Sequence, residues 1–123
     1  MSGFEDRTLI EDLVANCVDD WVYEALVCGN IARRVVSLPV ERRAVALGLT
    51  AEVLFTGLME AGDTSKGRGF VPWQAGPLES LARIARTWMP REDPDVRPGE
   101  IVWLRNTAKG NTLGREVLER EAS

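Results

Sequence analysis

The chain of 123 residues contains no histidine. Histidine is the commonest general base at neutral pH and the commonest metal ligand. Its absence excludes a Ser-His-Asp or Cys-His arrangement within the chain, and any zinc site built with imidazole. An enzyme of this sequence would need a site of carboxylates or arginines, and we expect no catalytic residues. The observation that would indicate such a site is a deep pocket lined by several of Asp19, Asp20, Glu24, Arg33 and Arg34.

Cysteine is scarce as well, because Cys17 and Cys28 are the only two. They form no C-x-x-C pair, and an all-thiolate zinc site needs four cysteines. If both lie on one helix, they are separated by roughly 16 Å along its axis, which is too far for a disulfide. We therefore expect two buried, small apolar residues and no metal.

Motifs for cofactors and membranes are missing too. Gly62, Gly67 and Gly69 lie close together, but the sequence has no Gly-Lys-Ser/Thr and no complete dinucleotide fingerprint. No EF-hand spacing occurs. Charged residues interrupt the most apolar stretch before it reaches the roughly 20 apolar residues of a membrane helix, and the N-terminus has no secretion signal. These absences predict no cofactor, no membrane contact and a cytoplasmic location.

Apolar residues are plentiful, at 45% of the sequence, which predicts a single domain over residues 1–123. Over residues 10–26 they recur at alternating spacings of three and one, which is typical of one face of a helix. The pattern predicts a long helix over residues 6–35. Asp19 and Asp20 are good N-cap types, so a second helix that begins there stays an open alternative.

Prolines and glycines divide the next part of the chain. Pro39 suits the first turn of a helix over residues 39–56, with Gly57 as its stop. Residues 48–50 could instead form the turn of a helix-turn-helix. A third helix is expected from Pro77 until Pro90 ends it. Its predicted inward face consists of Leu78, Leu81, Ala82, Ala85 and Trp88.

The segments between and after these helices are more polar. Residues 58–61 and 69–71 predict two short strands around a glycine-rich turn, and thus a hairpin. Residues 100–105 fit a strand or a helix, and we favour a helix because residues 107–110 offer a stop. Residues 112–121 predict a last, polar helix. The expected fold is therefore mainly α: a small helical domain with one short β-hairpin.

This order of elements resembles a winged-helix domain. Ala46-Leu-Gly-Leu-Thr50 is similar to a helix-turn-helix, and Gly57-Leu-Met-Glu-Ala-Gly-Asp63 to a first wing strand. Residues 51–56, at the place of the recognition helix, carry no Arg or Lys, which favours burial over groove reading. The sequence also resembles small uncharacterised bacterial proteins that share Gly-Leu…Ala-Gly-Asp…Gly-Phe…Pro-Trp (residues 57–73) and Trp…Asn-Thr…Gly (residues 103–110). That second resemblance implies no activity.

Charge is unevenly distributed along the chain. Residues 1–32 hold seven acids and one base, whereas residues 33–68 hold six bases and four acids. In a winged helix those bases would share a surface for phosphates or for an acidic protein, such as the N-terminal helix of a second copy. The alternative is that they are solvated or paired within the molecule. With Trp73 as an exposed anchor, the candidate contact residues are Arg33, Arg34, Arg42, Arg43, Lys66, Arg68 and Trp73.

These observations predict a non-enzymatic interaction module that binds another macromolecule. We expect a protein partner, and a second copy of the chain is one candidate. The alternative is a DNA-binding winged-helix regulator that uses the arginines of residues 33–43 and the Lys66/Arg68 wing. The net charge of −4 argues against binding nucleic acid with the whole surface.

Overall fold

The computed structural model describes residues 7–23, 27–65, 67–93 and 100–122. Four strands form one antiparallel sheet in the order β1-β4-β2-β3. They are β1 (Trp21–Tyr23), β2 (Met59–Ser65), β3 (Gly69–Pro72) and β4 (Trp103–Asn106). The α-helices are α1 (Leu9–Asn16), α3 (Pro39–Phe55), α4 (Pro77–Trp88) and α5 (Ala108–Ala122), and a π turn η2 (Val27–Ile31) and a 3-10 turn η3 (Ala32–Arg34) precede α3.

The predicted fold class is wrong, because the molecule is a mixed α/β structure and not a helical domain with one hairpin. Residues 21–23, expected to be helical, and residues 103–105, for which a helix was favoured over a strand, are strand residues that pair with each other. The hairpin is one edge of the resulting sheet and not a separate wing. Gly48 lies inside the continuous helix α3, so there is no helix-turn-helix at this point.

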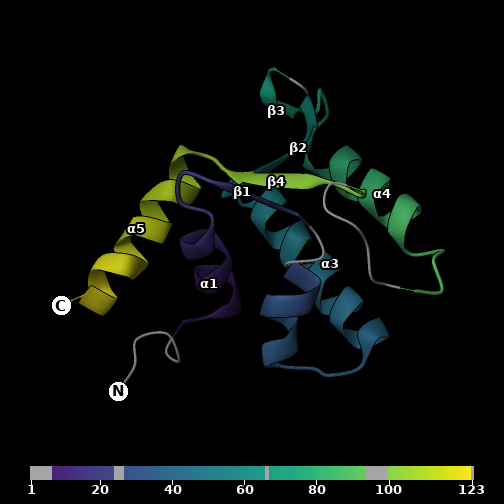
Figure 1. The fold of residues 1–123 in the computed structure, drawn as a ribbon, viewed down its shortest axis with the longest axis horizontal. Helices are drawn as coiled ribbons and strands as arrows, with labels where there is room; N and C mark the ends of the chain where they lie inside the picture. Colours follow the sequence, from purple (N-terminus) through teal and green to yellow (C-terminus); the bar gives the residue numbers. More distant parts are fainter. Residues whose placement is uncertain (1–6, 24–26, 66, 94–99, 123) are drawn as a thin grey trace.

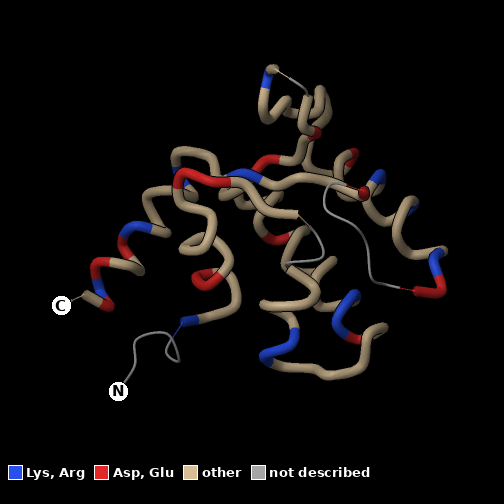
Figure 2. The backbone as a smooth tube through the Cα atoms, in the orientation of Figure 1, with Lys and Arg blue, Asp and Glu red and all other residues tan. Residues whose placement is uncertain are grey.

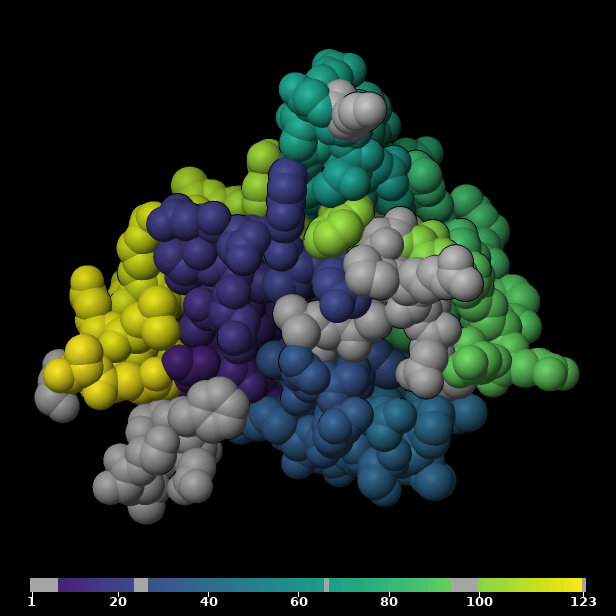
Figure 3. Space-filling model, in the orientation of Figure 1, coloured from purple at the N-terminus to yellow at the C-terminus, as the bar shows by residue number. Residues whose placement is uncertain are grey.

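The connections follow a β-α-β pattern twice, as β1-α3-β2 and β3-α4-β4. The strands of each unit are separated by a strand of the other: β4 lies between β1 and β2, and β2 lies between β3 and β4. These are two interleaved split β-α-β units. In Figure 1 the helices α1, α3 and α5 lie below the line of β1 and β4, while the hairpin rises above it. Figure 3 shows the same hairpin as the projecting apex of the molecule.

The first helix is shorter than predicted. The side-chain oxygen of Thr8 accepts from the Glu11 amide, and the Glu11 carboxylate accepts from the Thr8 amide, so a capping box begins α1. The helix ends at Asn16, and Asp19 has a left-handed φ of 57° in the turn that leads into β1. Neither the long helix nor a second helix starting at Asp19 or Asp20 is present.

Proline and glycine located the later helices correctly. Helices α3 and α4 begin at Pro39 and Pro77 as predicted, and Gly57, with φ 76°, follows the end of α3. The predicted last helix is present, but it begins at Ala108 and not at residue 112. Residues 107–110 therefore open this helix and do not stop an earlier one.

The hairpin is real but its register differs from the prediction. Residues 62–65 of β2 pair with β3, whereas residues 59–62 pair with β4. The predicted first strand at 58–61 therefore lies mainly against β4. The strand β2 is long enough to pair with both β3 and β4, and it thereby joins the hairpin to the rest of the sheet.

The core lies between the helices and one face of the sheet. Val22, Met59, Ala61 and Leu104 point to this side and are buried. The side chains of Cys17 and Cys28, 0% and 4% exposed, are buried as predicted, although the two residues do not share a helix. The inward face of α4 was predicted only in part: Ser80, Ile84 and Trp88 are its buried residues, while Leu78 is 70% exposed. Within the described ranges, no helix is long and apolar enough to cross a membrane.

Candidate functional site

The predicted contact residues do not all share one surface. Arg33 and Arg34 end η3, and Arg42 and Arg43 lie in the first turns of α3, at the bottom of Figure 2. Arg68 is in the turn between β2 and β3, at the opposite, upper end of the molecule. Lys66 lies outside the described residues. The convergence expected from a winged helix is therefore absent among the residues that can be placed.

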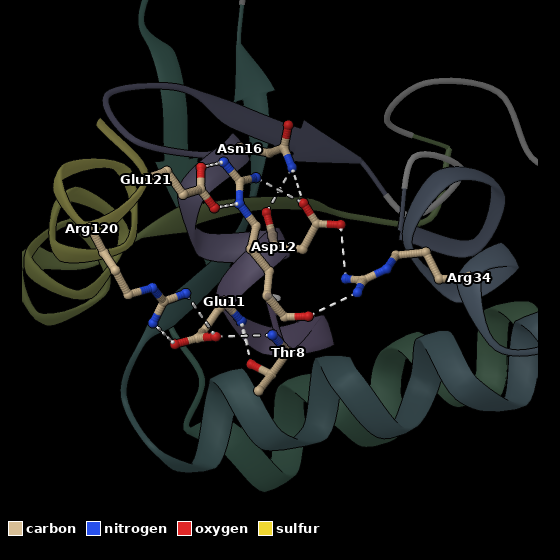
Figure 4. A network of polar contacts seen from close by, with 8 residues as sticks. Thr8, Glu11, Asp12, Asn16, Arg34, Arg120 and Glu121 are labelled. Carbon is tan, nitrogen blue, oxygen red and sulfur yellow. Dashed lines mark hydrogen bonds and ion pairs between the residues drawn. The ribbon is translucent and has the colours of Figure 1, made fainter. Parts of the chain in front are cut away.

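Arg34 belongs to an internal cluster of charges around Asp12, which is 2% exposed. The Asp12 carboxylate accepts from Arg34 at 3.2 Å, from Arg7 at 3.0 Å and from Asn16 at 2.9 Å. Figure 4 shows Asp12 with Arg34 on one side and Asn16 on another. Arg7 also pairs with Glu121 at the end of α5. This "Asp12 cluster" of Arg7, Asp12, Asn16, Arg34 and Glu121 ties α1, η3 and α5 together.

Arg42 and Arg43 donate hydrogen bonds to backbone carbonyls next to the ends of helices. Arg42 donates to the Ser37 carbonyl at 2.7 Å, just before α3. Arg43 is only 7% exposed and donates to the carbonyls of Trp88 at 3.2 Å and Arg91 at 2.7 Å. It thereby satisfies carbonyls at the C-terminal end of α4, where no further helical turn supplies donors. Both bonds are internal to the molecule.

Trp73 is engaged by its own molecule as well. Its indole N–H donates to Asp63 at 2.9 Å, and the Arg83 guanidinium lies 3.8 Å from the centroid of its ring. Arg83 also approaches the Asp63 carboxylate at 3.8 Å. The group fastens α4 to the hairpin, and it is an arginine stacked on an aromatic ring beside a carboxylate.

The strongest candidate surface is the face of the sheet that points away from the core. Burial alternates along β1 and β4, and the outward-pointing residues are partly exposed. Trp21 lies 6.1 Å from Trp103 between ring centroids, and Tyr23 meets Trp103 edge-on at 5.5 Å. The centroids of Trp21 and Phe70 are 5.9 Å apart. These four residues, Trp21, Tyr23, Phe70 and Trp103, are called the aromatic face below.

The aromatic face is continuous because the sheet curls. Strands β1 and β3 are opposite edges, which a flat sheet would separate by about 14 Å, yet Trp21 contacts Phe70. Two glycines permit this approach. A Cβ on Gly62 would lie 2.7 Å from the Phe70 ring, and one on Gly69, whose φ is 70°, would lie 3.2 Å from the Trp21 ring. The rings therefore rest on bare backbone.

A pocket of about 700 Å³ lies where β1 begins and β4 ends, at one end of the aromatic face. We call it the end pocket. Trp21 belongs to both the aromatic face and the end pocket. Arg105, which is paired with Trp21 across β1 and β4, also lines the pocket and lies over the ring of Phe70. Its volume is in the range of sites for small ligands or for a side chain of a partner. The lining residues are Asp19, Asp20, Trp21, Glu60, Arg105, Asn106, Thr107, Ala108 and Asn111.

Hydrogen bonds from the protein interior hold the walls of the end pocket. Asn106, 5% exposed, donates to the Val14 carbonyl at 2.9 Å and to the side-chain oxygen of Asn111 at 3.2 Å. The same Asn111 oxygen accepts from the Asp19 amide at 3.4 Å. Among the described residues, the Oδ1 atom of Asn106 has no donor. The turn that carries Asp19 is thus connected to the buried core.

The charges of the end pocket are predominantly acidic. Glu60 binds Arg105, whose guanidinium also lies 4.3 Å from the Phe70 ring centroid. Asp19 pairs with the exposed Arg115 at 3.0 Å. In the part of the chain that the structure describes, Asp20 has no ion-pair partner, and one of its oxygens accepts from the Trp21 amide at 2.8 Å.

The end pocket contains two of the five residues whose presence in a deep pocket would indicate an enzyme. Two of the carboxylates named in advance as signs of an enzyme, Asp19 and Asp20, line the pocket, but Arg33 and Arg34 do not; Glu24 lies outside the described residues. Within the described ranges, no group of three or more His, Cys, Asp or Glu side chains could hold a metal ion.

Sequence reasoning missed this site because it assigned residues 21–23 to a helix and favoured a helix over a strand for residues 100–105. The signal is present in the alternation Trp21-Val-Tyr23 and Trp103-Leu-Arg105, in which large aromatic or charged side chains flank one apolar residue. Such alternation is typical of a strand with one buried face. Three residues are too few for the pattern to prevail over the longer helical spacing in which Trp21 is embedded.

The fold and site define a small α/β protein with a four-stranded antiparallel sheet, helices on one face and a partly exposed aromatic surface on the other. Comparison with known proteins yields no matching family model, curated protein or solved structure.

Proposed function

We propose that this protein is a non-enzymatic interaction module that binds a segment of another protein on its aromatic face. One observation carries the proposal: four contiguous aromatic residues lie on the sheet face opposite the helices, and three of them are partly exposed. Aromatic side chains supply much of the binding energy in protein interfaces. Rings already ordered by one another lose little conformational entropy when a partner covers them.

A protein partner is favoured over nucleic acid by the charges. Single-stranded nucleic acids bind to sheets that combine exposed aromatic rings with several free cations. Of the described residues at this site, the one that offers a cation is Arg105, and Glu60 already binds it. Asp19 and Asp20 would repel phosphates, and affinity for a phosphate backbone depends on cations that release counterions.

The partner segment can come from another protein or from a second copy of the chain. The aromatic face is continuous with two sheet edges, so an extended segment can lie across it or beside it. Light scattering coupled to size-exclusion chromatography separates the two sources. A concentration-dependent dimer that the face variant below abolishes would identify the second copy as the occupant.

Selection from a random peptide display library tests the proposal. The wild-type protein is used for selection, and each enriched peptide is then measured against two variants. The face variant, Tyr23→Thr with Trp103→Thr, removes two rings but keeps residues with high strand propensity. The control variant, Phe55→Gln with Leu78→Gln, removes exposed apolar side chains from the helical layer.

We expect the face variant to weaken peptide binding at least about 10-fold, since buried aromatic anchors each contribute more than 1 kcal/mol in typical interfaces. The control variant should bind like the wild type. Circular dichroism and thermal unfolding establish that both variants are folded, and single substitutions replace the double variant if it is not. Peptides that lose affinity only for the control variant would contradict the proposal. Salt-sensitive binding of oligo-dT at the aromatic face would support the nucleic-acid proposal instead.

A further inference from the structure

We infer that the end pocket receives an arginine side chain of the partner. The inference rests on the proposed function, because it names the chemistry of the segment that the aromatic face binds. The pocket adjoins this face through Trp21, so a segment that covers the rings can direct one side chain into it.

The charge of the lining selects a cation. Three carboxylates, from Asp19, Asp20 and Glu60, face one guanidinium from Arg105, so the lining carries two more negative than positive charges. Arg115 offsets one of these through a pair with Asp19, but both side chains of that pair are more than half exposed and the pair is screened. Asp20, which lacks an ion pair among the described residues, is left to bind an incoming cation.

The molecule already uses this mode of binding twice. Arg83 stacks on Trp73 beside Asp63, and Arg105 stacks on Phe70 beside Glu60. Each group consists of a guanidinium, an aromatic ring and a carboxylate.

Trp21 and Asp20 supply the ring and the carboxylate of a third group, and both line the end pocket. In the described part of the chain no guanidinium completes this group. A partner's arginine would complete it, with its planar group over the ring and its N–H donors towards Asp20.

Hydrogen bonds connect the turn that carries Asp19 and Asp20 to the interior of the molecule. Asp19 adopts a left-handed φ of 57°, a conformation that Asp and Asn tolerate better than other residues with a side chain. The side-chain oxygen of Asn111 accepts hydrogen bonds from the backbone amide of Asp19 and from the side-chain amide of Asn106. The two carboxylates at positions 19 and 20 thus lie on a turn that is hydrogen-bonded to α5 and, through Asn106, to α1.

The test titrates the wild-type protein with N-acetyl-arginine amide and follows its NMR spectrum. We expect saturable shifts of the Trp21 indole and of the backbone amides of Asp20 and Asn111. N-acetyl-lysine amide should bind more weakly, and the uncharged N-acetyl-citrulline amide should cause no saturable shift. Asp20→Asn should weaken binding of the arginine probe about 10-fold, the usual effect of losing one charge-assisted hydrogen bond.

Two controls make the result specific. Glu52→Gln removes an exposed carboxylate from α3 and should leave the titration unchanged. Asp20→Asn keeps an oxygen that can accept from the Trp21 amide, so its fold should be intact, and thermal unfolding checks this. No saturable shift, equal shifts with the citrulline probe, or shifts that map elsewhere would overturn the inference.

Failure of the inference and failure of the proposed function give different results. Selected peptides that bind the aromatic face, contain no arginine and tolerate Asp20→Asn would refute the arginine assignment and leave the proposed function standing. Saturable binding of the arginine probe without any peptide on the aromatic face would refute the proposed function and leave the pocket assignment.

Discussion

Asp12 shows how one buried charge organises the N-terminal half of the molecule. A carboxylate that is 2% exposed is stable only when its lost hydration is replaced, and two arginines and an asparagine do this. Arg34, which looks in the sequence like part of a basic surface, has its guanidinium on this carboxylate. A basic pair in a sequence thus does not define a basic surface.

Asp12→Asn should destabilise the protein by about 3 kcal/mol, because it leaves Arg7 and Arg34 with a neutral partner in a partly buried cluster. Urea unfolding followed by circular dichroism measures the change. Arg115→Ala is the matched control, since its pair with Asp19 is exposed and should contribute less than about 1 kcal/mol. Equal effects of the two substitutions would show that the Asp12 cluster is not a stabilising element.

The two thiols should be unreactive in the folded protein. Burial, with a smaller contribution from the charge of Asp20, raises the pKa of the Cys17 thiol to about 12, so almost no thiolate forms at neutral pH. Cys28 is 4% exposed. Labelling with Ellman's reagent should be at least about 100-fold slower in buffer than in denaturant, where both should react. An exposed thiol introduced by Ser65→Cys should react at once, and rapid labelling of the wild type would contradict the assigned burial.

At the scale of elements, the contacts of α5 with α1 and with Leu58 depend on glycine. Gly110 and Gly114 lie one helical turn apart on α5. A Cβ on Gly110 would come within 2.0 Å of the Leu58 carbonyl, and one on Gly114 within 2.6 Å of the Val14 carbonyl and of the Val18 side chain. These glycines permit backbone contact and do not end a helix. Figure 1 shows the two helices side by side.

Gly114→Ala should therefore lower the free energy of unfolding by about 1 to 3 kcal/mol, as overpacking does, despite the better helix propensity of alanine. Gly48→Ala is the opposite case, because nothing lies within 4 Å of a Cβ at that position of α3. It should stabilise the protein by about 0.5 to 1 kcal/mol. Thermal and urea unfolding measure the change in the free energy of unfolding for both variants. The same sign for both would contradict the packing described for α5.

The elements bounded by proline and glycine could be predicted from the sequence, because these residues act through their own backbone. Pro39, Pro77 and Gly57 fix the limits of α3 and α4 in this way. The strands β1 and β4 were harder to predict, since each is three or four residues long and exists through pairing with a distant segment. A strand was only one of two alternatives for residues 100–105. The functional surface was missed with them, because its aromatic residues come together only when β1, β4 and the hairpin form one sheet.

At the scale of the whole molecule, acid should destabilise the fold through the two ends of the chain. Hydrogen bonds from Arg120 and from the Thr8 backbone lower the pKa of Glu11, and the bond from Arg7 lowers the pKa of Glu121. A carboxyl group whose pKa is lower in the folded than in the unfolded protein stabilises the fold when the pH is above its unfolded pKa, which is near 4.5 for both residues. This contribution is lost as the pH falls through the lower pKa of the folded state.

The free energy of unfolding should therefore fall from pH 6 to pH 3. A double variant, Glu11→Gln with Glu121→Gln, should be less stable than the wild type at pH 6 and should show a weaker dependence on pH. Urea unfolding at the two pH values tests this. An unchanged pH dependence in the double variant would assign acid sensitivity to other carboxyls.

Some acidic residues form ion pairs that stabilise the fold, whereas others line the end pocket. The two acidic residues of α1 pair within the molecule, Glu11 with Arg120 and Asp12 with its two arginines. Figure 4 shows the first of these pairs beside the Asp12 cluster. The acidic surplus that remains near the aromatic face lies in the end pocket, with Asp20.

The four tryptophans provide the most direct test of the central claim, that partners bind on the aromatic face. The chain gives one indole NMR signal for each of Trp21, Trp73, Trp88 and Trp103, of which Trp21 and Trp103 lie on this face and Trp88 is 0% exposed. Addition of the tightest peptide from the display selection should shift the Trp21 and Trp103 signals and leave those of Trp73 and Trp88 in place. Shifts confined to Trp73 or Trp88 would place the binding surface elsewhere and contradict the account.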